Sequence, residues 1–309
     1  MDALNEIANQ ILRINIAKLK KNATAVRSDL DPEAVHEMRI AIRRLRAALA
    51  TFKKILPAKA RKIQARLEKW GAILGKMRDL DIFGAFILQV IYIDATSIPK
   101  LTRQREQSQK QMVSKLDTKA YARLMKSLER LKTKKTAKNL QKFSKAKLQK
   151  ALHRVMKIAP CIDVHSDDKT LHKLRISIKK LRYNCEFFEP VFSQSACPLG
   201  TFIERTKHIQ DIIGEHQDSI VGIYLLRRHK HLFSKKAFLQ IHERYASKKK
   251  QTRAAFFKIW TRYCAGLKLI KLHFQGDINE DQLQRFPRTA GEKDQTPRLA
   301  DESTTVLPN

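Results

Sequence analysis

The sequence has few of the residues that interrupt helices. Only 9 of the 309 residues are glycine and 9 are proline, and both residue types weaken or end helices. Strand-like alternation of apolar and polar residues is scarce, whereas apolar residues recur with helical spacing along most of the chain. The sequence therefore predicts an all-α fold, and its 43% hydrophobic residues are enough for a globular core.

Cysteines and long hydrophobic runs are also scarce. The 4 cysteines stand far apart and form no Cys-x-x-Cys motif, which argues against a disulfide framework or a zinc ribbon. The longest apolar stretch, near 82–93, is interrupted by Gln89 and is too short to span a bilayer. The first residues lack the pattern of a signal peptide. We therefore expect a cytoplasmic chain without a transmembrane segment.

Acidic residues are few compared with basic ones. The chain holds 30 Asp and Glu against 63 Lys and Arg, and its formal net charge is +33. Such an excess favours a negatively charged partner, which could be nucleic acid, polyphosphate or an anionic membrane. Residues 275–309 differ, because they hold 7 acids, 4 basic residues and few large apolar groups. We expect a disordered tail there, beyond a folded body of residues 1–274.

Apolar periodicity and the prolines predict the helices. Ile7, Ile11 and Ile14 mark the apolar face of a first helix. Pro57, Pro160 and the region of Pro190 are predicted helix ends. Further helices are expected at about 32–56, 59–90, 101–115, 120–134, 138–156, 168–189, 199–231 and 236–272.

Two segments of the chain repeat each other in the same order. Residues 35–46 (Val-His-Glu-Met-Arg-Ile-Ala-Ile-Arg-Arg-Leu-Arg) align with residues 171–182 (Leu-His-Lys-Leu-Arg-Ile-Ser-Ile-Lys-Lys-Leu-Arg). Asp31 and Asp167 hold the same place before the two copies, as helix N-caps. A shorter pair, 74–79 and 213–218, follows downstream. The pattern predicts an internal duplication, with halves at about 1–158 and 159–274 and a pseudo-twofold relation.

A helical wheel gives both copies the same two faces. The apolar face holds Met38, Ile42, Leu45, Leu49 and Phe52 in one copy, and Leu174, Ile178, Leu181, Cys185 and Phe188 in the other. The cationic stripe beside it holds His36, Arg39, Arg43 and Arg46 in one copy, and His172, Arg175, Lys179 and Arg182 in the other. Cations at this spacing repel one another. We therefore expect a multivalent anion to offset the cost, with arginine donating paired hydrogen bonds to phosphate oxygens.

The stripe and its histidines each have a second interpretation. A single run of basic residues is usually a solvated face, but the recurrence of the stripe at the same angles in both copies argues against that. His36 and His172 could either contact an anion or pack and cap near a helix start, and both interpretations stay open. Nearby cations should hinder the protonation of these histidines.

The doubled His-helix resembles the CHAD family, the conserved histidine α-helical domain. The matching residues are Val35-His36-x-x-Arg39-x-x-x-Arg43-Arg44-Leu45-Arg46 and their counterparts in 171–183, and the segments near Gly75 and Gly214 look like the second motif of the family. The resemblance implies two four-helix bundles around a central basic channel that binds inorganic polyphosphate, and association with polyphosphate granules. By position, the channel would be lined by His36, Arg39, Arg43, Arg44, Arg46, His172, Arg175, Lys179, Lys180 and Arg182.

Other functions remain as alternatives. Sequence-nonspecific binding of RNA or DNA comes first, because residues 132–150 contain 8 lysines. Aromatic residues are not interleaved with the stripe, however, and no DNA-reading motif is present. A membrane surface ranks third, since the basic stretches lack an aromatic face.

Catalysis is not expected. The chain lacks the common nucleotide-binding and hydrolase motifs, and it lacks the Glu-x-Glu-x-Lys motif of a triphosphatase domain. Asp79, Asp81 and Asp218 are the acids that could hold a metal, but pairing with arginines or helix capping is the preferred interpretation. His229 and His231 are flanked by basic residues that repel a cation. We expect neither a metal nor a cofactor.

Overall fold

The computed structural model describes residues 3–28, 32–90, 97–192 and 199–275. All regular structure in these ranges is helical, as the sequence predicted. The helices are α1 (Ala3–Ser28), α2 (Pro32–Thr51), α3 (Ala60–Val90), α4 (Ser97–Leu116), α5 (Lys119–Glu129), α6 (Leu140–Ile158), α7 (Asp168–Phe192), α8 (Leu199–Arg228) and α9 (Lys235–Gln275), with short 3₁₀ turns at Ala159–Cys161 and Lys230–Leu232. None of these helices is long and apolar enough to cross a membrane.

Two helix ends predicted from prolines are wrong. One helix ends several residues before its proline, and the other continues past its proline. The helix expected to reach residue 56 ends at Thr51, and turns connect it to Pro57. Pro190 lies inside α7, which continues to Phe192. The ring of Phe192 packs edge-on against Phe274 of α9 at a centroid distance of 5.3 Å. This contact buries the last turn of α7, so the proline near its end is tolerated.

Two further predictions, the end of the helix at 120–134 and the apolar face of the first helix, are wrong in part. The helix expected at 120–134 ends at Glu129, and the lysine-rich segment that follows has no regular structure until Asn139 caps α6. On α1 the buried face includes Leu4, Ala8, Leu12 and Leu19. Ile14 is 48% exposed, so the face predicted from the isoleucines was wrong for that residue.

The N-cap of α7 is confirmed. Asp167 accepts a hydrogen bond from the backbone N–H of Thr170 at 2.7 Å. Its predicted counterpart Asp31, like the expected tail beyond residue 275, lies outside the described residues.

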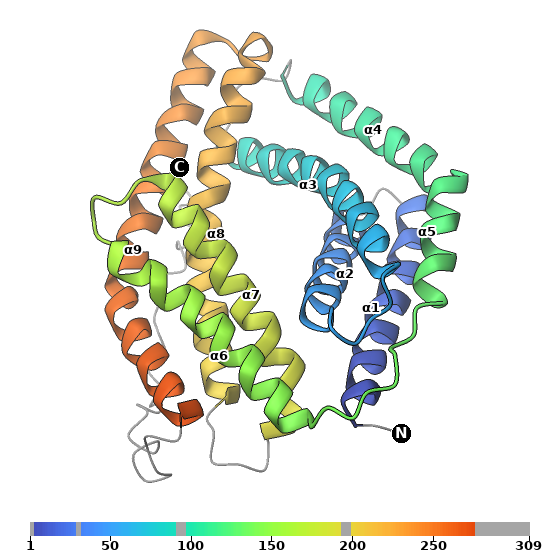
Figure 1. The fold of residues 1–309 in the computed structure, drawn as a ribbon. Helices are drawn as coiled ribbons and strands as arrows, with labels where there is room; N and C mark the ends of the chain where they lie inside the picture. The colour runs from blue at the N-terminus through green and yellow to red at the C-terminus, as the bar shows by residue number, and fades with distance from the viewer. Residues whose placement is uncertain (1–2, 29–31, 91–96, 193–198, 276–309) are drawn as a thin grey trace, which may run out of the picture.

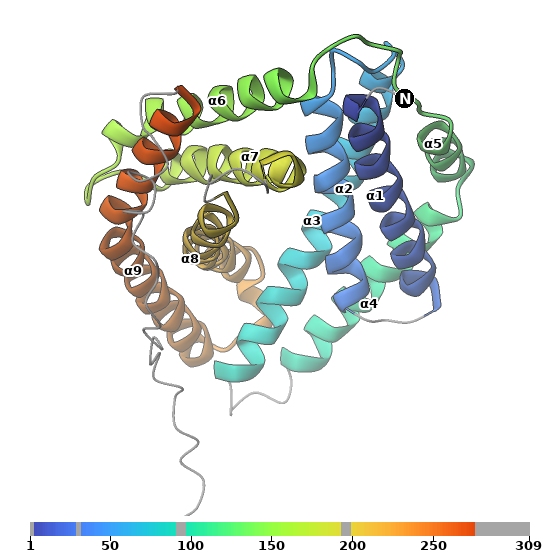
Figure 2. The same cartoon turned by 90° about the horizontal axis from the view of Figure 1, so that it is seen from below.

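The helices form two groups that lie side by side (Figure 1, Figure 2). In the first group, α2 packs on α1 and α3, and α4 packs on α1 and α3, while the short α5 covers one flank. In the second group, α7 packs on α6 and α8, and α9 packs on α6 and α8. The order of neighbours is the same in both groups. The two groups meet where α2 contacts α7 and where α3 contacts α8 and α9.

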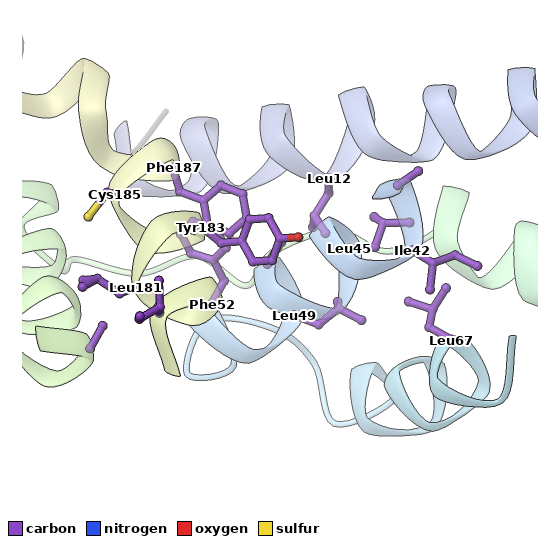
Figure 3. Close-up of a cluster of buried hydrophobic side chains, with 14 of the residues drawn as sticks. Leu12, Ile42, Leu45, Leu49, Phe52, Leu67, Leu181, Tyr183, Cys185 and Phe187 are labelled. Carbon is purple, nitrogen blue, oxygen red and sulfur yellow. The ribbon is translucent and has the colours of Figure 1, made fainter. Parts of the chain in front are cut away.

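Aromatic residues hold the two groups together at the end of α2. The ring of Phe52 stacks on Phe143 of α6 at 6.1 Å and packs edge-on against Phe188 of α7 at 5.9 Å. Figure 3 shows Phe52 beside Tyr183 and Phe187 of α7, with the leucines of α2 continuing the same core. Thr51 also donates a hydrogen bond to the side chain of Asn184 at 3.0 Å. One hydrophobic core therefore extends through both groups.

A smaller core joins the groups at the opposite end. Phe83 and Phe86 of α3 pack against Tyr245 of α9, and Phe86 lies 3.7 Å from the Tyr245 ring in a stacked arrangement. Gly222 of α8 makes room for this ring, because a Cβ at Gly222 would be 2.3 Å from Cε1 of Tyr245. The two contact regions fix how α2 and α7 face each other.

Candidate functional site

Burial of the predicted apolar faces sets the rotation of α2 and α7. The ten residues of these faces are each at most 1% exposed: Met38, Ile42, Leu45, Leu49, Phe52, Leu174, Ile178, Leu181, Cys185 and Phe188. The prediction of both faces is confirmed, and so is the buried thiol of Cys185. Because the stripes lie beside these faces, they are turned toward the neighbouring helices α3 and α8.

A glycine lies against the first arginine of each stripe. A Cβ at Gly75 of α3 would lie 4.0 Å from Nε of Arg39, and a Cβ at Gly214 of α8 would lie 3.4 Å from Nη2 of Arg175. These are the glycines of the repeated Gly-Asp segments. Their function in the structure is to leave space for a guanidinium at the same position of each helix pair.

The last arginines of the stripes also face corresponding positions. Nη1 of Arg46 lies 3.7 Å from the place of a Cβ at Gly71. Nε of Arg182 donates a hydrogen bond of 2.9 Å to the amide oxygen of Gln210. Gly71 precedes Gly75 by the same number of residues as Gln210 precedes Gly214. The two stripes therefore lie on their partner helices in the same register.

The two histidines differ in environment although they face corresponding residues. Burial, followed by the charge of Arg78, lowers the pKa of His36, as the sequence predicted for a histidine near cations. Nδ1 of His36 is buried and has no hydrogen-bond partner among the described residues. His172 is exposed, and its Nδ1 is hydrogen-bonded to Oε1 of Gln217 at 2.9 Å. Arg78 was not among the predicted site residues, because it lies on α3 outside the stripe.

The two stripes converge on one region. Burial, together with the charges of Arg175, Arg43 and Arg39, lowers the pKa of Lys179 to about 6. Burial also lowers the pKa of Arg175. The charge of Asp218 raises this pKa, and the charges of Arg43 and Arg39 lower it. Cations of α2 and α7 thus act on each other directly, although 136 positions separate Arg39 from Arg175. Each is partly buried, so solvent screens their repulsion only in part.

Two acids sit within this group of cations. Burial raises the pKa of Asp79, and the charge of Asp218 raises it further, while Arg39 and Arg175 act in the opposite direction. Asp79 and Asp218 hold corresponding places in the repeated segments. They partly neutralise the arginines, which matches the preferred interpretation of these acids. Asp81 points elsewhere and accepts a hydrogen bond of 2.7 Å from Arg105 on α4.

Some guanidinium donors at the site lack partners. Nε of Arg43, Nε of Arg78 and Nε of Arg175 are buried without a hydrogen-bond partner among the described residues. A buried donor without a partner costs roughly 1–3 kcal/mol, and more when the group is charged. The site is therefore unfavourable by itself in two respects, like-charge repulsion and unpaired donors, and an anion would relieve both.

An acid of α7 links both helices. The carboxylate of Glu186 on α7 accepts hydrogen bonds from Arg182 and from Arg44 of α2. The contact with Arg44 could not be found from helix periodicity, because it crosses between the two groups of helices. Arg46 pairs with Glu68 at 3.0 Å, and Lys180 is exposed on α7.

One group of residues has the proximity of metal ligands. The ligand atoms of Glu33, His36 and Glu37 on α2 all lie within 4.8 Å of one another. Burial, together with the charges of Arg78 and Arg43, lowers the pKa of His36 and outweighs the opposite effect of Glu33 and Glu37. The same positive charges repel a metal cation, so this group gives no reason to assign a metal.

Known proteins share this fold. The family model described as the CHAD domain matches residues 10–227. A crystal structure of the CHAD domain from the plant Ricinus communis superposes with a TM-score of 0.60 and 23% identity, over 91% of this chain and 95% of that one. PptA from Streptomyces chartreusis superposes with a TM-score of 0.62 and 13% identity, over 84% of this chain and 99% of that one.

Curated relatives are less informative. Uncharacterized proteins from two Mycobacterium tuberculosis strains, CDC 1551 / Oshkosh and ATCC 25618 / H37Rv, are each 26% identical over 220 residues. The match covers 64% of this chain and 40% of either relative. The chain therefore corresponds to less than half the length of these relatives.

Proposed function

Because the chain belongs to the CHAD domain family, we propose that it binds inorganic polyphosphate between α2 and α7. The observation that carries the proposal is the convergence of Arg39, Arg43, Arg175 and Lys179 from two helices into one partly buried region. Cations held this close in a half-buried place need a ligand with several negative charges.

The chemistry of the site suits a chain of phosphates. Arginine presents a planar fork that donates paired hydrogen bonds to phosphate oxygens. Nε of Arg43 and Nε of Arg175 are buried donors without a partner in the described structure, and a phosphate oxygen could accept from each. Binding would then replace unpaired donors with charge-assisted hydrogen bonds, which are the stronger class.

The other predicted residues are expected to contribute less to the affinity than the central arginines. His36 is half-buried beside the central cations, and His172 is exposed at the corresponding place. Arg46 and Arg182 continue the stripes toward their far ends. Arg44 and Lys180 stand off the stripes, and Arg44 is already bonded to Glu186. We expect the central arginines to contribute most of the affinity and Arg44 to contribute mainly to holding α2 against α7.

An internal duplication explains the matching contacts. Arg39 with Gly75 corresponds to Arg175 with Gly214. The packing order of α1–α4 likewise corresponds to that of α6–α9. We infer two four-helix bundles, in halves of about residues 1–158 and 159–274, that face each other across a basic channel. This arrangement would place both stripes along one polyphosphate chain.

The proposed role is binding rather than catalysis. The acids of the site, Asp79 and Asp218, lie among arginines, so the proposal assigns them the role of balancing positive charge. A polyphosphate-binding protein in the cytoplasm would associate with polyphosphate granules. Imaging of a fluorescently tagged chain beside a polyphosphate stain tests this localisation, and uniform fluorescence in granule-containing cells would contradict it.

Calorimetry tests the binding site. Wild-type protein is titrated with tripolyphosphate, and a variant with Arg39→Glu, Arg43→Glu and Arg175→Glu is compared with a control that carries Lys258→Glu, Lys268→Glu and Lys271→Glu on the exposed face of α9. Three lost charge-assisted contacts predict a fall in affinity of at least about a hundredfold in the first variant only. Equal losses in both variants would indicate diffuse electrostatic attraction without a site.

A second titration separates polyphosphate from nucleic acid. Long-chain polyphosphate and double-stranded DNA are compared at matched phosphate concentration and physiological salt, because salt strongly affects binding to both. The proposal predicts tighter binding of polyphosphate. Equal or tighter binding of DNA would favour the nucleic-acid alternative.

A further inference from the structure

A second group of cations lies outside the two stripes. We call it the outer cluster, and its members are Lys54, Lys138, Lys147, Lys150 and Arg154. Lys54 follows the end of α2, Lys138 precedes α6, and the other three lie on α6. The cluster thus joins three segments of the chain, and the contact between α2 and α6 through Phe52 and Phe143 brings them together.

The outer cluster contains positive charge without compensation. Burial, together with the charges of Lys54, Lys150, Arg154 and Lys138, lowers the pKa of Lys147 to about 8. The charged groups that mainly shift this pKa are cations. Within the described part of the chain, no acid forms an ion pair with any member of the cluster. Crowding of this kind costs stability unless an anion is present.

Lys147 of the outer cluster packs on an aromatic ring that is part of the core. The amine of Lys147 lies 5.0 Å from the centre of the Phe143 ring, within the range of a cation–π contact. Phe143 in turn stacks on Phe52 and packs edge-on against Phe188 at 6.2 Å. These rings belong to the core that joins the two halves, so Lys147 is held in place rather than free in solvent.

The outer cluster is separate from the central site. Arg43, the central arginine of α2 nearest to this end, and Thr51, the last residue of α2, are 8 positions apart, which is about 12 Å along a helix axis. Lys54 lies beyond that end. No group of the outer cluster is among the main causes of the pKa shifts of the central cations, so the two groups of cations are distinct.

The composition of the cluster points to a phosphate chain and not to nucleobases. Four of its five members are lysines, which act as point charges and do not require a planar ligand. Its aromatic ring, Phe143, is in contact with Lys147 and stacks on the core ring of Phe52. The cluster thus holds one aromatic ring that already contacts a lysine and a core ring, whereas single-stranded nucleic acid stacks successive bases on several rings.

We propose that the outer cluster is a second site for inorganic polyphosphate, which one long chain occupies together with the central site. The identity of the ligand rests on the function proposed above, whereas the existence of a second anion site does not. Two linked sites on one ligand raise the apparent affinity by mass action, because binding at the first site concentrates the chain at the second. The protein would then prefer long chains to short ones.

The test compares chain lengths in full-length variants. One variant carries Lys54→Ser, Lys147→Ser, Lys150→Ser and Arg154→Ser, and a control of equal charge carries Lys21→Ser, Lys236→Ser, Lys258→Ser and Lys271→Ser at exposed positions. Calorimetry measures the affinity of each for tripolyphosphate and for long-chain polyphosphate, and circular dichroism checks that both variants are folded. We expect the first variant to lose at least about tenfold in affinity for the long chain. Its affinity for tripolyphosphate at the central site should match that of the control.

The possible outcomes separate this proposal from the previous one. Equal long-chain affinities in the two Ser variants would overturn the outer site. A loss of the same size for tripolyphosphate would also overturn it, because it would mean that the substitutions act on the central site.

In the variant with three central substitutions, long-chain binding that survives and then disappears on addition of the Ser substitutions would support the outer site. If wild type binds no tripolyphosphate, the function proposed for the central site fails, and the long-chain titration still decides the outer one. In the variant with three central substitutions, tighter binding of double-stranded DNA than of polyphosphate would overturn the assignment of the ligand of the outer cluster.

Discussion

Gly214 of α8 lies directly against the guanidinium of Arg175, and a Cβ at this glycine would be 3.4 Å from Nη2. A methyl group would nearly fit, but a larger side chain would occupy the place of the guanidinium. The glycine therefore determines where Arg175 points. The corresponding Gly75 leaves slightly more room for Arg39, at 4.0 Å from Nε.

The first prediction concerns this glycine. Gly214→Leu should displace Arg175 and weaken the binding of tripolyphosphate by roughly tenfold or more, which corresponds to one lost charge-assisted hydrogen bond of about 1.5–3 kcal/mol. Calorimetry measures the affinity. Gly84→Leu is the control, because nothing lies within 4 Å of a Cβ at Gly84 on α3. Unchanged affinity in Gly214→Leu would show that the direction of Arg175 does not matter.

The second prediction places alanine at two glycines, where it should change the free energy of unfolding in opposite directions. Gly222→Ala places a Cβ 2.3 Å from the Tyr245 ring, and such overpacking should destabilise the fold by about 1–3 kcal/mol. Gly84→Ala meets no neighbour, so the helix propensity of alanine should stabilise the fold by up to about 1 kcal/mol. Urea unfolding followed by circular dichroism measures both. Similar effects of the two substitutions would mean that the Tyr245 ring moves aside easily.

The third prediction concerns the acid that joins α2 to α7. Glu186→Gln removes the charge that accepts hydrogen bonds from Arg44 and Arg182. Because the Glu186 side chain is only 14% exposed, its loss should lower the free energy of unfolding by about 1.5–3 kcal/mol in the absence of ligand. Glu204→Gln, at an exposed position of α8, serves as the control in the same urea experiment. A loss no larger than that of the control would show that the bridge contributes little.

The sequence was sufficient for features that depend on one helix alone. The apolar faces of α2 and α7 and the cations beside them follow from a period of 3.6 residues, and the repeat assigned both helices the same role. The position of Ile14 was misjudged because an isoleucine at helical spacing does not reveal which side another helix will cover. The end of α2 was misjudged because the core around Phe52, and not Pro57, decides where the chain turns.

Features that depend on packing between different helices could not be read from the sequence. Arg78 approaches His36 from α3, and Glu186 reaches Arg44 from α7. Lys54 joins the cluster on α6 only because the end of α2 packs against Phe143. Each of these contacts joins residues far apart in the chain. Helix periodicity gives the direction of a side chain but not the identity of the helix that it meets.

The fourth prediction is a pH dependence of binding. The pKa of Lys179 is lowered to about 6 by burial and by the facing charges of Arg175, Arg43 and Arg39, which outweigh the opposite effect of Asp218. In the free protein the amine is therefore mostly neutral above pH 6. A bound polyanion favours the charged amine, so binding takes up a proton, and affinity should rise by up to tenfold per unit as the pH falls toward about 6.

Calorimetry with tripolyphosphate between pH 6 and pH 8 measures this effect. Titration of the ligand itself also changes affinity with pH, so the comparison is made with Lys179→Met, which should show a shallower dependence. Lys173→Met removes an exposed charge from the same helix and should keep the wild-type slope. Parallel slopes for wild type and Lys179→Met would show that this lysine does not change its protonation on binding.

The fifth prediction follows from the acids among the central cations. Asp218 acts on Arg175, Arg39 and Lys179, so it partly neutralises the site in the free protein and repels an anion that enters it. Asp218→Asn keeps the shape of the side chain and removes the charge. We expect tighter tripolyphosphate binding by several-fold, together with a less stable free protein, because the cations lose an internal partner. Asp211→Asn changes the net charge equally at an exposed position of α8 and should leave both properties nearly unchanged. A variant at Asp218 that binds more weakly than this control would mean that the acid orients the arginines for the ligand, since loss of orientation would then outweigh the relief of repulsion.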